Sequence, residues 1–467
     1  MTVLSWILVM LFIGVQITYL LAMLIDVYFY TRPVDRVDMS RLADIPPDEY
    51  PHIVLFYPVL HELEETMRTT FCALARMDYP SDKYDVIAIP NHDDPDTIAS
   101  LRRLQQEFAF MKILEVPATT DPGWQVVWDT WDTDRHAYWY HSGATAGIRN
   151  LPPKKTRQLI YAFYNVWQQR RGSGDFLVNY IDADSAPPRD HFKAGAVGIR
   201  QFDVLQATNI AGNLMHSLPA SWFAFDHIVW DANKYGRLTA GGRHPFWVLG
   251  KGLFFKASDL HTYGGFNPWI TIEDPEVGMR LWKNGKTLGL IEAPLVEEVP
   301  ETLAGGITQR KRWIAGFFQS LDTPLREMGF TRLERIKAWM NFLPCLSLTF
   351  NAIGIPISIW ALVLWWQGSS PVPLWAVWLA GVNALALTVM LLRFYWVAWV
   401  KTRIVIPSVL LRLAYLFRVN PLFLLVFWFI WTIPLWLGWR MYLKNTGLVW
   451  ERTKKINANN DMIRHPG

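Results

Sequence analysis

The sequence is poor in cysteine and carries little excess of charge. Its two cysteines, Cys72 and Cys345, lie far apart and lack the spacing of metal ligands, which excludes a disulfide framework and a zinc site. A formal net charge of +4 over 467 residues is too small for the concentrated basic face of a nucleic-acid binder, so we expect no nucleic-acid partner. The N-terminus lacks the basic region and the small-residue cleavage site of a removable signal peptide. We therefore expect its first apolar segment to be retained as an anchor.

Charged residues are also missing from long apolar stretches. These stretches cover residues 2–25, 338–392 and 419–439, and the second is long enough for two spans divided at the polar turn 367–370. Each span would contain about 20 residues or more, the length that crosses a bilayer's hydrocarbon core. Buried core helices are the alternative, but 51% hydrophobic residues and 25 tryptophans favour membrane spans. Arg32 and Arg36 directly follow the first span, which predicts a cytoplasmic location for the next 300 residues.

The number of crossings after residue 392 stays open. If the two spans in 338–392 go out and return, Arg393, Lys401 and Arg403 are cytoplasmic. One more crossing at 419–439 would put Arg440 and Lys444 outside, against the positive-inside tendency. The alternatives are re-entrant segments broken at prolines 407 and 434, or a short extra span at 404–417. We expect a cytoplasmic C-terminus.

Residues 31–330 have the pattern of short apolar runs separated by turns that is typical of a globular domain. Short apolar runs at 52–58, 84–90, 111–117 and 176–182 alternate with helical patterns at 62–77 and 96–108. This alternation predicts a parallel α/β sheet with helices on both faces. Residues 118–150 are rich in tryptophan without a clean period, and we interpret them as an insertion or loop that either packs internally or stacks on sugar. An amphipathic interfacial helix is predicted over 314–329. The predicted domains are an anchor (1–30), a catalytic domain (31–330), transmembrane helices (331–445) and a cytoplasmic tail (446–467).

Acidic residues follow two of the predicted strands. Asp182 and Asp184 come at the end of the strand at 176–182, on the sheet edge where open α/β folds bind ligands. Hard carboxylate ligands at that edge suit Mg²⁺ or Mn²⁺ carrying a diphosphate, whereas the alternative is a helix cap or a solvated turn. Asp93 and Asp94 follow the strand at 84–90, where they could bind a base or ribose or simply form an Asx turn before a helix.

Three further motifs are candidates. The glycines of Gly250-Lys251-Gly252 allow close approach of backbone to a ligand, or form a plain turn. Glu273 and Asp274 precede a helix, so Asp274 is either a catalytic base or an N-cap. The set Gln309, Arg312 and Trp313 combines an amide, a cation and an aromatic face, which suits a diphosphate and a sugar, or an interfacial anchor.

Taken in order, these motifs resemble the membrane-embedded family 2 glycosyltransferases, which include cellulose, hyaluronan, chitin and poly-N-acetylglucosamine synthases. Within that family the chain is most similar to the bacterial branch that contains the phage N4 adsorption protein. The resemblance rests on PNHDDPDT (90–97), EDPEVGMRL (273–281), QRKRW (309–313) and WERTK (450–454), and covers residues 50–320 well and the tail loosely.

The resemblance implies a GT-A type, Rossmann-like α/β catalytic domain joined to α-helical membrane spans. It implies inverting transfer of a hexose from a UDP-sugar to a growing polysaccharide at the cytoplasmic face of the bacterial inner membrane, with secretion of the chain. A single transfer to a membrane lipid and an inactive receptor or scaffold are the alternatives. The implied partners are the UDP-sugar, a polysaccharide or lipid acceptor, and membrane lipids. Further copies of the chain and secretion proteins are additional candidates.

The resemblance also implies roles for single residues. On the donor side, Asp93 or Asp94 would contact the uridine and Lys155 would lie near the diphosphate. Asp182 would face the nucleotide and the metal, and Asp184 would ligate the metal. Acceptor-side and catalytic roles fall to Gly250, Gly252, Glu273, Asp274 (base), Gln309, Arg312 and Trp313. Trp450, Arg452, Thr453 and Lys454 resemble a gating segment. Two positions depart from the family: Ile160 stands where asparagine is usual, and the glycine strand lacks a cysteine or serine.

Overall fold

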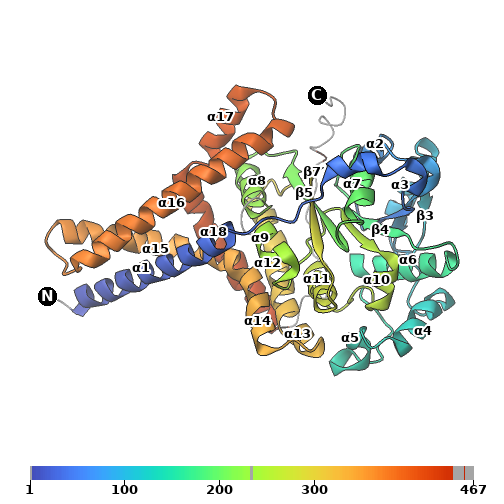
Figure 1. Ribbon diagram of the computed structural model, residues 1–467, viewed down its shortest axis with the longest axis horizontal. Coiled ribbons are helices and arrows are strands. Elements are labelled where there is room, and N and C mark those ends of the chain that lie inside the picture. The colour runs from blue at the N-terminus through green and yellow to red at the C-terminus, as the bar shows by residue number, and fades with distance from the viewer. Residues whose placement is uncertain (1–2, 232–234, 445–456, 458–467) are drawn as a thin grey trace.

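The computed structural model describes residues 3–231, 235–444 and 457. An α/β body occupies one end of the molecule and long apolar helices extend from the other (Figure 1). The strands are β1 (Ile53–Val59), β2 (Tyr84–Pro90), β3 (Met111–Ile113), β4 (Leu177–Tyr180), β5 (Val204–Ala211), β6 (Leu253–Lys256) and β7 (Leu288–Glu297). The helices of the body are α2 (Glu64–Leu74), α3 (Pro95–Glu107), α4 (Gln125–Thr133), α5 (Tyr138–His141), α6 (Lys155–Gln169), α7 (His191–Gly198), α8 (Leu218–Trp230), α9 (Gly236–Leu238), α10 (Ala257–Thr262) and α11 (Asp274–Lys283).

The seven strands form one sheet in the order β3-β2-β1-β4-β6-β5-β7. Helices α2, α3 and α7 cover one face, and α4, α6 and α11 cover the other. Strands buried on both faces need continuous apolar sequence, and β1 is buried at all of its positions. These features confirm the predicted α/β class and its GT-A type.

The expectation of an all-parallel sheet is wrong at β6. This strand runs antiparallel to both β4 and β5, whereas β5 and β7 are parallel. After β5 the chain leaves the sheet through α8, and it returns at the same strand-end edge, beside Asp274, before β6 begins. A strand that enters from that edge must run opposite to its neighbours. The strand-and-helix alternation of the sequence carries no sign of this return.

The tryptophan-rich segment 118–150 is helical where the sequence suggested an irregular insertion. It contains α4 and α5, and Trp124, Trp128 and Trp131 lie on one helical face at spacings of four and three residues. All three rings are buried, with 0–3% of their surface exposed. Internal packing, the first of the two alternatives, therefore explains this aromatic cluster.

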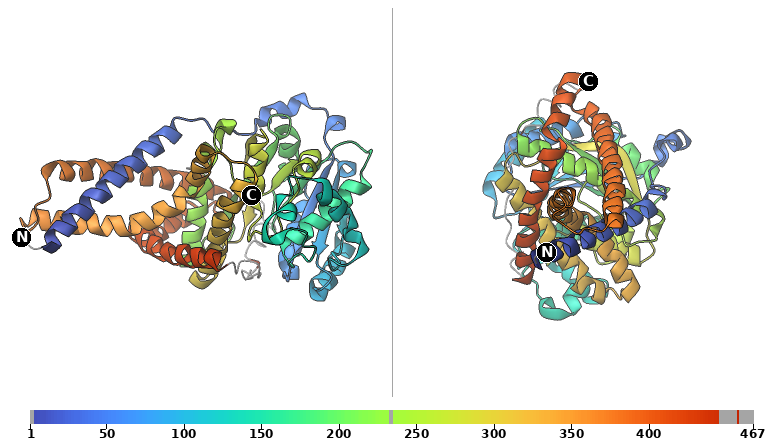
Figure 2. Two further views of the ribbon diagram at one scale, coloured as in Figure 1. Left: turned by 90° about the horizontal axis from the view of Figure 1, so that it is seen from below. Right: turned by 90° about the vertical axis from the view of Figure 1, so that its left-hand side faces the viewer.

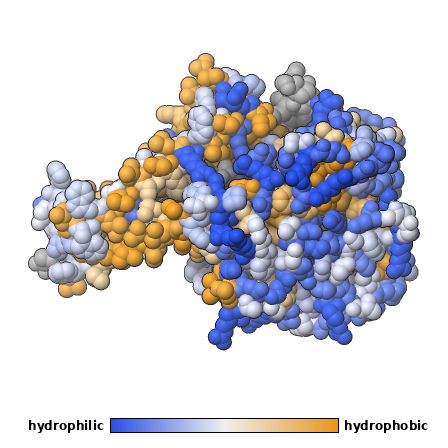
Figure 3. Space-filling view, in the orientation of Figure 1, coloured by the Kyte–Doolittle hydropathy of each residue, from blue (hydrophilic) through white to orange (hydrophobic). Residues whose placement is uncertain are grey.

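The remaining helices are α1 (Val3–Tyr30), α12 (Leu303–Leu321), α13 (Thr323–Glu327), α14 (Arg332–Trp339), α15 (Leu343–Trp366), α16 (Leu374–Lys401), α17 (Val409–Arg418) and α18 (Pro421–Leu443). Within the described part of the chain, four helical segments, covering the four expected stretches, are long and apolar enough to cross a membrane: Val3–Tyr30, Arg332–Trp366, Leu374–Ile404 and Pro421–Leu443. Their surface is largely hydrophobic (Figure 3). Helix α17 has 10 residues, too few for the extra span considered at 404–417. Pro434 lies inside the continuous helix α18 and does not interrupt it.

Helices α1, α15 and α16 extend together away from the body, whereas α18 runs steeply across its end (Figures 1 and 2). The helix predicted at 314–329 differs from the observed one. Helix α12 begins at Leu303, carries the QRKRW motif, and ends at Leu321, and a separate short helix follows. Helix α12 packs against both the body and α18, so it joins the sheet to the apolar helices.

Candidate active site

The strand-end edge of the sheet gathers three of the predicted acidic residues around one lysine. Asp182 follows β4, and its Oδ1 lies 2.6 Å from Nζ of Lys155, the first residue of α6. The same Nζ lies 3.5 Å from Oε1 of Glu273 and 4.7 Å from the ring centroid of Tyr180. Burial alone would lower the pKa of Lys155, but Asp182, Glu273 and Asp274 together raise it. The lysine is therefore a fixed positive charge at this edge.

Asp274 is held by two donors from other elements. The Tyr180 hydroxyl donates to its Oδ1, and the backbone N–H of Gly250 donates to its Oδ2 at 2.9 Å. Asp274 is the first residue of α11, and Glu273 occupies the N-cap position without a side-chain capping bond. The carboxylate therefore faces the sheet edge instead of capping its own helix. Burial, and next the negative charge of Glu273, raise the pKa of Asp274 well above its usual range.

Close packing explains the glycines of the 250–252 turn. A Cβ on Gly250 would stand 2.9 Å from Asp274 Oδ2 and 3.5 Å from Lys155 Nζ. Gly252 has a φ of +53°, and a Cβ there would stand 2.7 Å from the His191 ring. Glycine at these two positions therefore lets the backbone of the turn pack closely against Asp274 and His191.

Two cavities meet at these residues. The outer cavity, of about 190 Å³, is lined by strand-end residues and by Lys155, Glu273 and Arg312. The inner cavity, of about 150 Å³, extends toward the apolar helices and reaches Cys345 on α15 and Trp431 on α18. The residues that line both are Asp182, Asp184, Ile272, Asp274, Gln309 and Trp313. A shared wall containing Asp274 is the arrangement that a transfer between two bound molecules requires.

Helix α12 contributes the predicted amide, cation and indole to this wall. Gln309 and Trp313 line both cavities, and Arg312 lines the outer one. The side chain of Arg312 is 8% exposed, so its charge is largely removed from water. The Trp313 ring lies 5.7 Å from the His227 ring. The structure therefore brings the three predicted residues to one site.

Sequence reasoning missed several residues of the inner cavity. Glu297, the last residue of β7, accepts from the side chains of Asn209 and Ser185, each at 2.7 Å. Burial, and then the charges of Asp184 and Asp182, raise the pKa of Glu297 to about 7. The available signal was an acidic pair after a long apolar run at 288–298, the same pattern that drew attention to Asp182.

A buried ion pair borders the inner cavity on the side of the apolar helices. Nη2 of Arg310 lies 2.8 Å from Oδ2 of Asp226, and the Arg310 guanidinium lies 5.3 Å from the ring centroids of both Trp313 and Trp431. Lys251 also lines this cavity and pairs with Asp231 at 2.7 Å. Arg310 and Lys251 lie within the QRKRW and Gly250-Lys251-Gly252 motifs, but nothing in the sequence indicated their partners Asp226 and Asp231.

The carboxylates at this edge of the sheet suit a divalent cation that binds together with a phosphate-bearing ligand. Among the described residues, no group of three or more His, Cys, Asp or Glu side chains is arranged to hold a metal ion alone. Asp182 and Asp184 nevertheless line the inner cavity together with Glu297, whose pKa is raised by burial and then by the negative charges of Asp184 and Asp182. Mg²⁺ characteristically binds through one or two carboxylates plus substrate phosphates. The donor set therefore suits a cation shared with a diphosphate.

Two groups of predicted residues lie elsewhere. Asp94 is buried, caps α3 by accepting from the N–H of Thr97 at 3.3 Å, and also accepts from the N–H of His61 at 2.7 Å. Asp93 pairs with Arg157 at 3.4 Å. Neither aspartate lines the outer or inner cavity, so their contact with a nucleotide stays a prediction. Trp450, Arg452, Thr453 and Lys454 lie outside the described residues.

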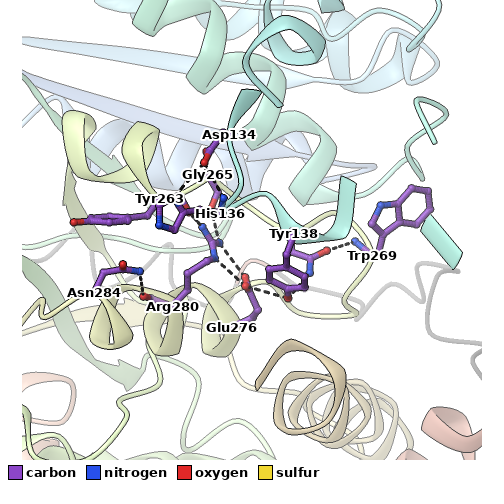
Figure 4. A network of polar contacts seen from close by, with 10 residues as sticks. Asp134, His136, Tyr138, Tyr263, Gly265, Trp269, Glu276, Arg280 and Asn284 are labelled. Atoms are coloured by element: carbon purple, nitrogen blue, oxygen red, sulfur yellow. Dashed lines mark hydrogen bonds and ion pairs between the residues drawn. The ribbon is translucent and has the colours of Figure 1, made fainter. Parts of the chain in front are cut away.

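A polar network around Glu276 and Arg280 anchors α11 (Figure 4). Arg280 pairs with Glu276 one turn earlier, with Nε to Oε1 at 2.9 Å, and donates to the backbone oxygen of Gly265 at 2.7 Å. Tyr138 of α5 donates to Glu276 at 3.2 Å. The tryptophan-rich segment thus anchors the helix whose first residue is Asp274.

Comparisons with known proteins identify the family of the chain. The model of the family described as glycosyl transferase family group 2 matches residues 177–443, more than half of the chain. A beta-monoglucosyldiacylglycerol synthase from Synechocystis sp. is 24% identical over 278 residues, which are 58% of this chain and 48% of that protein. The chain thus spans about half the length of this relative.

Two solved structures are similar to the chain. The mannosyltransferase PcManGT from Pyrobaculum calidifontis, solved with GDP-Man and Mn²⁺, has 15% identity and a TM-score of 0.49, covering 93% of this chain and 99% of that one. Residues 1–349 of TarS from S. aureus have 12% identity and a TM-score of 0.37, covering 62% of this chain and 70% of that one.

Proposed function

The chain belongs to glycosyl transferase family group 2, and from this premise we propose that it moves a hexose from a UDP-sugar to an acceptor that arrives from the membrane side. The observation that carries the proposal is the meeting of the outer and inner cavities at Asp274. The outer cavity would hold the nucleotide sugar and the inner cavity the acceptor. The intact set of carboxylates argues against an inactive receptor or scaffold.

The donor would be bound by charges on the outer cavity. Lys155 and Arg312 line it, and a planar guanidinium or an ammonium group suits diphosphate oxygens. Asp182 and Asp184 would hold Mg²⁺ or Mn²⁺ together with the diphosphate oxygens. Such a cation, when bound, neutralises charge that develops on the departing UDP.

Asp274 would be the base of an inverting reaction. As the acceptor hydroxyl oxygen attacks the anomeric carbon, its proton passes to Asp274 and the bond from that carbon to the diphosphate oxygen breaks. Tyr180 and Gly250 hold the carboxylate at the boundary of the two cavities. Glu273 supports this arrangement because its Oε1 lies 3.5 Å from Nζ of Lys155 and helps to hold that lysine in place.

The acceptor is the finer part of the proposal. The aromatic rings of Trp230, Trp313 and Trp431 in the inner cavity would suit a growing polysaccharide, as made by the processive synthases and the phage-adsorption branch that the motifs resemble. A second observation favours a lipid. The helix cavity, of about 80 Å³, shares Asp226 and Trp230 with the inner cavity and is lined mainly by apolar side chains of α8, α15, α16 and α18.

This apolar passage would hold the chain of a lipid and leave its polar head beside Asp274. The Synechocystis relative is named for synthesis of a monoglucosyl lipid. We therefore propose single transfer to a membrane lipid as the principal function, and polymer synthesis with secretion as the second candidate.

The proposed location is the bacterial inner membrane with the body in the cytoplasm. Helices α1, α15 and α16 would cross the bilayer, and α18, which runs across the end of the body, would lie along its surface (Figures 1 and 2). Three crossings return the chain to the side of the body. Asn457 accepts a hydrogen bond from Thr69 of α2 at 2.9 Å, which supports a cytoplasmic C-terminus. The gating role of residues 450–454 stays a prediction.

The test is transfer by the purified full chain in nanodiscs. A panel of radiolabelled nucleotide sugars is supplied with diacylglycerol-containing lipid, and the products are separated by thin-layer and size-exclusion chromatography. We expect one donor to give a lipid-soluble product with a single sugar. A long polymer would instead establish the second candidate. If no donor gives a lipid-soluble product or a polymer, the proposed function is contradicted.

A further inference from the structure

A second charged cavity lies on the membrane side of the body, away from Asp274. This basic cavity, of about 270 Å³, is formed by the linker after α1, by α9, by β5 and β7, and by the last two turns of α16. Its cationic lining residues are Arg36, Arg237, Arg393 and Lys401. We propose that it binds the phosphate of an anionic membrane phospholipid.

The charges of this cavity do not cancel. Its two carboxylates, Asp231 and Glu292, are already paired, with Lys251 at 2.7 Å and with Arg36 at 3.0 Å. Arg237 donates through Nη1 to the backbone oxygens of Tyr30 and Arg32. Arg237, Arg393 and Lys401 form no ion pair with a carboxylate among the described residues, so the lining keeps an excess of positive charge that suits an anion with acceptor oxygens.

The position of the cavity selects a lipid among possible anions. It lies where α1 ends and where α16 reaches its last residues, at the border between the apolar helices and the hydrophilic body (Figure 3). Trp396, Val397 and Val400 of α16 line the same cavity as Lys401. An apolar wall beside a cationic one matches a ligand whose phosphate adjoins hydrocarbon, and basic pockets at the cytoplasmic ends of membrane helices bind such head groups.

A neighbouring cavity offers room for the hydrocarbon. This span cavity, of about 390 Å³, lies between α1, α15 and α16 and is lined mainly by apolar side chains such as Met23, Leu387 and Met390. Arg393 lines both cavities, so they adjoin at its side chain. A phosphate in the basic cavity would thus place an acyl chain against α16 within the membrane.

The test measures binding, so it does not depend on the transferase function. The full chain is purified in neutral detergent and delipidated. Its thermal unfolding is then followed with phosphatidylglycerol, with phosphatidylcholine, and with soluble glycerol phosphate, and native mass spectrometry counts retained lipids. The variants are Lys401→Gln, Lys401→Arg as a charge-preserving variant, and Arg403→Gln as the matched control, because Arg403 is exposed, two residues away and outside the cavity.

We expect phosphatidylglycerol to stabilise the parent protein and to remain as one bound lipid, with little effect of phosphatidylcholine. Lys401→Gln should weaken the apparent affinity by about five- to tenfold through loss of a charge-assisted contact, whereas Lys401→Arg and Arg403→Gln should retain it. Equal responses of Lys401→Gln and Arg403→Gln would overturn the assignment to this cavity. Stabilisation by glycerol phosphate equal to that by phosphatidylglycerol would overturn the lipid and identify a soluble phosphate ligand.

Discussion

Replacement of Asp274 by asparagine separates catalysis from structure. The amide keeps the size of the side chain and one carbonyl oxygen, so it can accept from Tyr180 or from the Gly250 N–H but not from both. Loss of one neutral hydrogen bond costs about 1 kcal/mol, which the fold should tolerate. Loss of a general base lowers a rate by about 10²–10⁴-fold, or roughly 3–5 kcal/mol in barrier height. We therefore expect a folded, donor-binding and nearly inactive enzyme.

The assay measures UDP release that depends on acceptor, together with donor affinity by calorimetry. Asp96→Asn, at an exposed position on α3, is the control and should keep the parental rate. A rate of Asp274→Asn within about tenfold of the parent would refute the role of base, since the expected loss is at least ~10²-fold. A collapse in thermal stability would instead show that the residue is chiefly structural.

The same residue predicts a pH dependence with a defined sign. The pKa of Asp274 is raised by burial and by Glu273, so the protonated form is favoured in the folded, empty enzyme. Transfer should therefore increase with pH as this carboxyl loses its proton, and the acidic limb should disappear from the residual activity of Asp274→Asn. Folding stability has the opposite trend. Because the folded-state pKa exceeds the unfolded one, the contribution of this group is present at low pH and is lost as pH rises through the folded-state value.

Three further outcomes are expected. Chelation by EDTA should abolish transfer, and Mg²⁺ or Mn²⁺ should restore it. The Asp184→Asn protein should be inactive although it inserts and folds. Turnover in the presence of chelator would contradict a role for the metal. Glu276→Gln should lower the free energy of unfolding by about 3–5 kcal/mol because the charge of Arg280 stays buried without its partner, measured by denaturant titration in detergent. In a background lacking native cysteines, Ser369→Cys, at an exposed position between α15 and α16, should react with an impermeant thiol reagent in intact cells, and Asn457→Cys should react only after lysis. Labelling of Asn457→Cys in intact cells would overturn the three-crossing topology.

The spans and most strands could be predicted because each depends on local composition. Charge-free stretches identified the four long apolar helices, and bounded apolar runs identified β1, β2 and β4. The direction of β6 could not be predicted, because it depends on where the chain returns after α8. The helices within 118–150 were obscured by charged residues placed between tryptophans that share a helical face.

The site residues likewise divide into those that could be predicted from the sequence and those that could not. Asp182, Asp184, Asp274, Gln309 and Trp313, all identified from motifs, converge on the boundary of the two cavities. The missed residues act through partners that lie far away in the sequence. Arg310 pairs with Asp226, 84 residues earlier, and borders the inner cavity on the side of the apolar helices. Pairs of this kind have no local pattern, so only the fold reveals them.

The site is built jointly by the body and the apolar helices. Helix α12 carries Gln309, Arg312 and Trp313, and it packs along α18. Trp431 of α18 and Cys345 of α15 complete the wall of the inner cavity. A protein truncated before α15 would therefore keep the sheet but lose both this wall of the inner cavity and the support of α12. The apolar helices are thus part of the site itself, because they supply the side from which the proposed lipid acceptor would enter.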